Sequence, residues 1–305
     1  MQTPIEMISV CPHDTSELDF LHRLARRDLE SNVCVESSLV QENMDFFSDS
    51  TLHLQKLEVV GTHLSDALSI IQSRCKHLVL RCHASALFPK VHLGVQSTLL
   101  QCLSLHHVAI DTDIFASLRI HTLCLDSCQV NASVITVPSS VRELALHHQY
   151  FPKMDLDVEA LQEISICDYA EFSNDFLQML APVPKIRLAR NTCDLFFPQN
   201  QIVSIENHAR FLHDSGVSCK ELSVDDSRHI PAQSSIVSLV VSGDFSALQP
   251  IDTVERLVLQ GTSAEEHIPK LEGFPHLKYL MLSRIVVDDL ALTSPEKVEI
   301  VVAFQ

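Results

Sequence analysis

A short pattern of apolar and polar positions recurs along this chain. Two apolar residues flank one variable residue, and in twelve of fifteen copies an apolar residue or a cysteine stands three positions before the pair. The clearest copy runs from Ile120 through Leu123 and Leu125 to Val130. Alternation over so few residues predicts a short strand whose side chains point alternately inward and outward.

The paired apolar positions return every 17 to 25 residues along the sequence. They are Ile8/Val10, Val33/Val35, Leu57/Val59, Leu78/Leu80, Leu103/Leu105, Leu123/Leu125, Leu144/Leu146, Ile164/Ile166, Ile186/Leu188, Val203/Ile205, Leu222/Val224, Leu239/Val241, Leu257/Leu259, Leu280/Leu282 and Val298/Ile300. One such strand cannot bury its apolar face alone. Stacking of successive units into a parallel sheet over one continuous core is therefore predicted.

The segment from Ile120 to Val130 resembles the leucine-rich-repeat motif LxxLxLxx(N/C)xL at every fixed position, and Val183 to Cys193 is a second good copy. The resemblance implies an α/β leucine-rich-repeat solenoid: a single domain over residues 1–305 with about 15 units. A curved parallel sheet would form the concave side, with short helices, 3₁₀ or extended segments on the convex side. The asparagine position is matched by Asn191 and Cys128 alone, which predicts an irregular twist.

Unit length predicts what covers the convex side. Four segments have helical spacing and caps: Glu17–Glu30, Ser65–Cys75, Ser173–Leu180 and His208–Ser215. Units of 17 to 19 residues, common after Val203, leave too little chain for a full helix. Extended or 3₁₀ segments are expected there.

Composition narrows the class of protein. The chain of 305 residues is 46% hydrophobic and 20% charged, which is typical of a folded domain. Its net charge of −17 disfavours direct contact with nucleic acid or an anionic membrane and favours a basic segment on a protein partner.

The ten cysteines include no CxxC pair and are scattered along the units, which is typical of small buried side chains in a reducing compartment. The first residues do not resemble a secretory signal, and no apolar run approaches the ~20 residues that cross a membrane. We expect an intracellular protein, cytoplasmic or nuclear. Repeats that run nearly to both termini also suggest open sheet edges available for assembly.

Familiar catalytic and phosphate-binding motifs are absent from the sequence, and its six glycines are dispersed. We therefore expect a protein that is not an enzyme and that needs no cofactor.

Candidate binding residues follow from the outward positions of the predicted strands. Small residues, Ser104, Cys124, Ala145 and Ser165, occupy the middle of four successive units. They are bordered by a polar set that predicts a shallow partner-binding groove: Arg81, His106, Asp126, Glu143, His147 and Glu163. The three carboxylates would bind lysine or arginine of the partner. Two alternatives are a zinc site at His106, Asp126 and His147, and ordinary solvated polar residues.

A second candidate surface lies later in the chain. Val240, Val258 and Met281 occupy one outward column, with Tyr279 beside it. Exposed apolar patches usually mark contact sites, although tight curvature or the terminal segment could instead cover this one.

These observations predict a non-catalytic scaffold or adaptor that binds a protein or peptide on its concave face. One alternative is a structural accessory subunit of a larger complex. Another is the substrate-recognition arm of a ubiquitin ligase, which would need the catalytic segments from another subunit. An enzyme with an unrecognised site is the third hypothesis.

Overall fold

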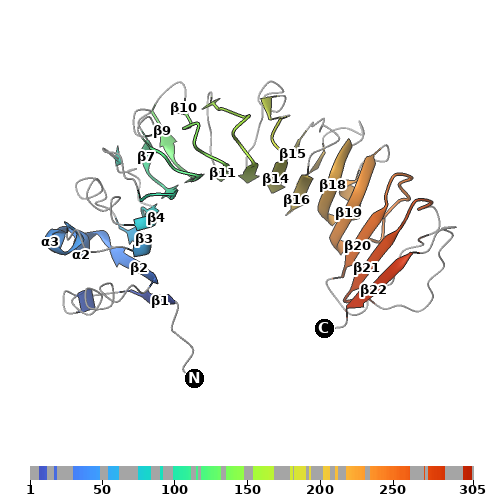
Figure 1. The fold of residues 1–305 in the computed structure, drawn as a ribbon, viewed down its shortest axis with the longest axis horizontal. Helices are drawn as coiled ribbons and strands as arrows, with labels where there is room; N and C mark the ends of the chain where they lie inside the picture. Colours follow the sequence, from blue (N-terminus) through green and yellow to red (C-terminus); the bar gives the residue numbers. More distant parts are fainter. Residues whose placement is uncertain are drawn as a thin grey trace. The chain divides into compact units, whose positions relative to one another are not determined.

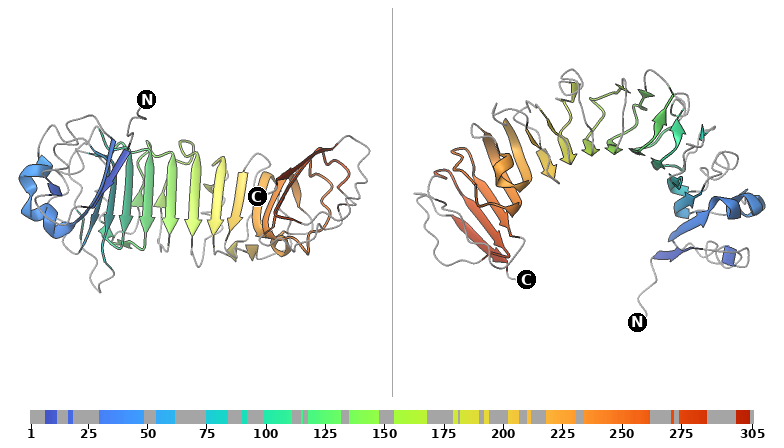
Figure 2. Two further views of the ribbon diagram at one scale, coloured as in Figure 1. Left: turned by 90° about the horizontal axis from the view of Figure 1, so that it is seen from below. Right: turned by 180° about the vertical axis from the view of Figure 1, so that it is seen from behind.

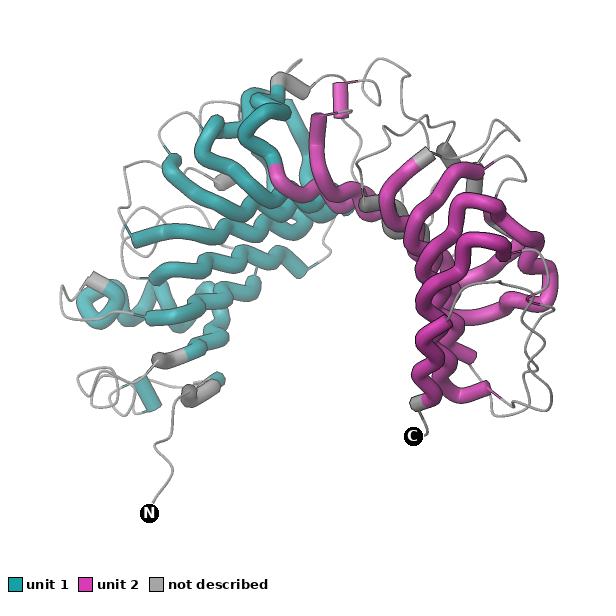
Figure 3. Tube along the Cα trace, turned by 45° about the vertical axis from the view of Figure 1, so that its right-hand side comes forward, with its two compact units in different colours: residues 1–161 teal, residues 162–305 magenta. Residues whose placement is uncertain are grey.

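The chain divides into two compact units, Met1–Leu161 (unit 1) and Gln162–Gln305 (unit 2), shown in Figure 3. The structure is a computed structural model. It describes residues 7–11, 17–18, 30–48, 54–61, 75–83, 90–91, 99–110, 115, 118–131, 135–147, 154–167, 179–180, 182–189, 192–193, 202–206, 210–211, 218–230, 234–261, 271, 274–285 and 298–303.

Each unit is a parallel-strand β-solenoid in which successive turns contribute neighbouring strands (Figures 1 and 2). In unit 1 the long strands are β1 (Met7–Val10), β2 (Glu30–Glu36), β3 (Leu54–Val60), β4 (Cys75–Arg81), β6 (Cys102–His106), β8 (Thr122–Asp126) and β11 (Glu143–His147). They pair in that order and all in parallel.

Unit 2 repeats the arrangement with eight long strands. They are β13 (Glu163–Cys167), β14 (Lys185–Ala189), β16 (Ile202–Glu206), β18 (Ser218–Asp226), β19 (Ser235–Asp244), β20 (Arg256–Gln260), β21 (Tyr279–Ser283) and β22 (Glu299–Ala303). These strands also pair in sequence order and in parallel. The predicted repetition of parallel strands is therefore confirmed within each unit.

The predicted apolar pairs line the core. Leu103, Leu123 and Leu144 lie in register on β6, β8 and β11, and each is at most 1% exposed. Burial of one leucine or valine side chain is worth about 1.5–3 kcal/mol. Repeating it on most of the described long strands supplies an aliphatic core in a chain that has no tryptophan.

The first and last predicted pairs are placed two residues too early. Val10 lies beside Val33, and Ile300 and Val302 lie beside Leu280 and Leu282. Side-chain direction repeats every two residues along a strand, so a two-residue error keeps every side chain on its predicted face. The apolar pattern alone could not detect such a shift.

A repeated turn ends several of the described long strands. The residue after the strand donates its backbone N–H to a carbonyl of the next strand: His107 to Asp126, Ser127 to His147 and Gly261 to Ser283, each at 2.9 Å. His107 and Ser127 have left-handed backbone, with φ of 55° and 51°. Such values are strained for residues other than glycine, and the inter-strand hydrogen bond compensates for part of that cost.

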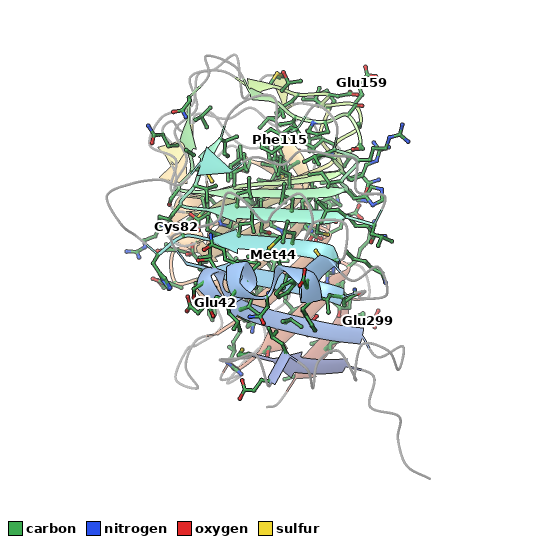
Figure 4. All side chains as sticks on the ribbon, turned by 90° about the vertical axis from the view of Figure 1, so that its left-hand side faces the viewer. Glu42, Met44, Cys82, Phe115, Glu159 and Glu299 are labelled. Carbon is green, nitrogen blue, oxygen red and sulfur yellow. The ribbon has the colours of Figure 1, made fainter. Side chains whose placement is uncertain are left out.

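Short strands form the other side of each solenoid. In unit 1 they are β5 (Lys90–Val91), β7 (Ala109–Ile110), β9 (Gln129–Val130), β10 (Ile135–Thr136) and β12 (Met154–Asp155). In unit 2 they are β15 (Thr192–Cys193) and β17 (Arg210–Phe211). The 3₁₀ turn η3 (Ser227–His229) follows β18 and contacts β18 and β19. Figure 4 shows the labelled Phe115 among the crowded side chains of unit 1 and Glu159 pointing away from them.

Helices are few among the described residues. They include α2 (Ser37–Glu42) and α3 (Met44–Ser48), which the pattern of apolar residues did not predict. The helix predicted over His208–Ser215 is wrong at Arg210 and Phe211, which pair in parallel with β15 as β17. The other predicted helices lie almost wholly outside the described residues, apart from a helical Glu17 and Leu18 and a helical Met179 that is followed by a turn at Leu180. Glu30 and Cys75 begin strands instead of ending helices.

Candidate functional site

The outer face of β6, β8 and β11 carries three columns of side chains at equal register. We name these nine residues the unit 1 polar surface. Its central column is Ser104, Cys124 and Ala145, its turn-side column is His106, Asp126 and His147, and its start-side column is Cys102, Thr122 and Glu143. Glu143 is exposed and the other eight are partly exposed, so the predicted inward and outward alternation holds on all three strands.

The turn-side column contains a polar contact between His106 and Asp126. His106 Nδ1 lies 3.1 Å from Asp126 Oδ2, and the Ser127 hydroxyl donates to Asp126 Oδ1 at 3.0 Å. Burial lowers the pKa of His106, and the hydrogen bond to Asp126 opposes that effect. Because Ser127 is the left-handed residue of the turn, the repeat itself positions the hydroxyl that holds this carboxylate.

The start-side and central columns contain weaker polar contacts. The Thr122 hydroxyl donates to Glu143 Oε2 at 3.2 Å, and that carboxylate is exposed. Burial raises the pKa of Cys124 to about 11, with Asp126 adding to the effect and Ser104 opposing it. Cys124 therefore stays a protonated thiol near neutral pH, which does not suit a nucleophile.

Arg81 lies next to His106 in register, but its guanidinium is engaged elsewhere. Arg81 Nε lies 3.4 Å from Glu58 Oε1, and Lys56 Nζ lies 3.0 Å from Glu58 Oε2. Burial alone would raise the pKa of Glu58, yet the two cations outweigh it and the pKa is lowered. Glu58 and Lys56 were not among the predicted site residues, although both are partly exposed on β3.

In unit 2, Glu163 is already compensated. Lys185 Nζ lies 2.9 Å from Glu163 Oε2, and Arg187 Nε lies 2.7 Å from Glu163 Oε1. A lysine or arginine of a partner would have to compete with these two neighbours. The structure therefore gives Glu163 less capacity for a partner than the sequence pattern suggested.

The predicted apolar strip lies on β19, β20 and β21, where Val240, Val258 and Met281 are in register and Val301 of β22 continues the column. Val258 is 9% exposed, so its neighbours cover most of it and the strip is less exposed than predicted.

A cation borders the strip. The Arg256 guanidinium lies 5.4 Å from the centre of the Tyr279 ring. Arg256 Nη1 also lies 3.6 Å from Glu221 Oε2 and 3.1 Å from the Ser238 hydroxyl. Arg256 thus covers one face of the Tyr279 ring, although Arg256 was not among the predicted site residues.

The zinc alternative gains no support. Within the described part of the chain, no group of three histidine, cysteine or acidic residues is arranged to hold a metal ion. His106 and Asp126 are in contact, and His147 does not join them as a third ligand.

Comparison with known proteins does not place the chain in a family. No family model matches it, and neither the curated proteins nor the solved structures include a significant match. No helix among the described residues is long and apolar enough to cross a membrane.

Proposed function

We propose that this protein is a non-catalytic interaction scaffold of the leucine-rich-repeat type, which binds a basic segment of a protein partner on the unit 1 polar surface. One observation carries the proposal. β6, β8 and β11 lie in uninterrupted register. On their outer face, a central column of small side chains lies between two columns of mostly larger polar side chains. A partner's backbone can approach the small residues while its side chains reach the bordering groups.

Charge supports the choice of partner. Asp126 and Glu143 lie on either side of the low column, on neighbouring strands. Glu143 is exposed, and its described hydrogen bond comes from the neutral Thr122 hydroxyl. The net charge of −17 would also attract a basic partner from a distance.

The test uses two charge-matched variants in affinity purification from the cells that produce the protein. The first variant carries Asp126→Lys and Glu143→Lys on the unit 1 polar surface. The control carries Asp157→Lys and Glu159→Lys, two exposed carboxylates of unit 1 outside that surface. We expect a stoichiometric basic partner with the wild type and the control, and at least a tenfold lower recovery with the first variant. Equal recovery with both variants would rule out this surface.

A second candidate, an accessory subunit of a larger complex, is favoured by a different observation. Ile300 and Val302 continue the buried rows of Leu280 and Leu282 but are 43% and 36% exposed. Exposed apolar side chains on β22 suit contact with another apolar surface. Ile300→Lys would weaken such an assembly and leave binding at the unit 1 polar surface unchanged.

A further inference from the structure

Two cysteines meet at the first pair of strands in unit 1. Val10, the last residue of β1, lies beside Val33 of β2. One more residue in the same register places Cys11 beside Cys34. Neighbouring strands are about 4.8 Å apart, which lies within the range of about 4.4–6.8 Å that Cα atoms of a disulfide span.

The two thiols also contact each other and can be reached from solvent. Besides burial and Glu58, the neighbouring Cys11 raises the pKa of Cys34, which requires the two thiols to lie close together. Cys11 is exposed and Cys34 is partly exposed. The register, the contact and the exposure are independent requirements for disulfide formation, and this pair meets all three.

Other cysteines of the described chain provide a contrast. Cys75, Cys128 and Cys219 are buried, and burial raises the pKa of each thiol to about 12. These thiols behave as small core side chains, as the sequence predicted.

We propose that Cys11 and Cys34 are a thiol-oxidation site, at which a small-molecule disulfide such as oxidised glutathione drives formation of a reversible bond between β1 and β2. The exposed Cys11 sulfur attacks the small disulfide, forms a mixed disulfide and releases one glutathione thiol. The Cys34 sulfur then attacks Cys11 and releases the second. The two protein thiols lose two electrons and two protons, and one oxidised glutathione becomes two reduced molecules.

The local charges predict how the second step depends on pH. Burial, Glu58 and Cys11 raise the pKa of Cys34, and Lys56 lowers it. The attacking form is the thiolate, so ring closure accelerates as pH rises. Glu58→Gln, on β3, removes a negative charge beside Cys34 and should speed closure several-fold at pH 7.5. Glu36→Gln, which removes a charge from the β2 strand that carries Cys34, should not.

The experiment incubates the full chain in glutathione buffers of increasing oxidised fraction, blocks remaining thiols with an alkylating reagent and maps tryptic peptides by mass spectrometry. Cys11 lies in peptide 1–23 and Cys34 in peptide 28–56, with one cysteine in each. We expect these two peptides to be linked by a disulfide at oxidant levels at which Cys75, Cys128 and Cys219 remain free of disulfide links. Those buried thiols should react with the alkylating reagent only after the protein is denatured. Excess reduced glutathione should release the link.

Variants separate the two steps. Cys34→Ser should stop the reaction at a glutathione adduct on Cys11, and Cys11→Ser should abolish the link. Cys124→Ser, a control on the same face of the unit 1 sheet, should form the link like the wild type. The proposal is overturned if native wild-type protein keeps glutathione on Cys11 without linking to Cys34, or if the link appears only together with links to buried cysteines.

Discussion

His106 shows how a repeated position acquires individual chemistry. Burial lowers the pKa of this histidine, so the unfolded chain takes up a proton more readily than the folded one. The contribution of His106 to stability is therefore fully present above its unfolded pKa of about 6.5 and is lost as pH falls through the lower folded value.

Asp126→Asn tests this dependence. Removal of the carboxylate removes an effect that raises the pKa of His106, so we expect the pKa to fall further. An imidazole titration followed by NMR measures that shift, and urea unfolding at pH 8 and pH 5 measures the larger loss of stability at low pH. Glu143→Gln is the control, because Glu143 lies in a different column and contacts Thr122 instead. An unchanged His106 pKa in Asp126→Asn would contradict the assignment.

Cys124 and Cys128 test the orientation of side chains around one turn. Cys124 is partly exposed on the outer face, whereas Cys128 is buried and its thiol donates to the Leu105 carbonyl at 3.2 Å. We expect Cys124 to be alkylated faster than Cys128 in the native protein. Because their pKa values are raised to about 11 and about 12, both reactions should be slow at pH 7 and faster at pH 9. Equal rates would mean that the two thiols do not differ in exposure.

At the level of elements, the backbones of β18 and β19 approach each other closely. Their register shifts between Val224 and Asp226. A Cβ atom added to Gly243 would lie 2.1 Å from the Asp225 carbonyl oxygen, a distance that no side-chain rotation can relieve. Glycine at this position therefore permits the close approach of the two backbones.

We expect Gly243→Ala to lower the free energy of unfolding by on the order of 2 kcal/mol. Ser242→Ala, on the exposed neighbouring position of β19, should change it by less than about 0.5 kcal/mol. Chemical denaturation followed by circular dichroism compares the two. Similar stability of both variants would show that the strands can separate without cost.

Strand positions were predictable from the sequence because alternation along a strand and the return of apolar pairs both reflect the repeating core. Leu103 and Leu123 were assigned the correct neighbours for this reason. The contacts of individual side chains were not predictable. The predicted register already places Lys185 beside Glu163 and Arg187 beside Ser165. Which carboxylate each cation turns toward depends on side-chain rotamers, and the apolar pattern does not specify them.

Segments away from the long sheets were less predictable for another physical reason. Their backbone is set by how each turn closes, so local helical spacing is a weak guide. Arg210 and Phe211 have helical spacing in the sequence but pair as a strand with β15. Residues from Ser37 to Ser48 form two short helices although the unit has the same apolar pair as its neighbours.

At the scale of the molecule, stability in each unit comes mainly from contacts between adjacent turns. The long strands of unit 1 pair with their sequence neighbours, and so do those of unit 2. A destabilising substitution on one strand should therefore affect the adjacent turns most. Binding surfaces on different strands can accordingly be altered separately. The single array of about 15 leucine-rich repeats over residues 1–305 stays a prediction.

The hydrogen-bonded turn after β6, repeated after β8, has a consequence for how such a chain can change its length. His107 bonds to the next turn as Ser127 bonds to the one after it, so these successive turns have the same attachment. Tandem duplication of residues 103–122 should therefore insert one extra turn and preserve a cooperative fold, with circular dichroism per residue close to that of the parent. Insertion of residues 103–112 alone would break the register, and the resulting protein should aggregate or be digested readily. Gain and loss of whole turns would then be an accessible route by which genes of this type diverge in size.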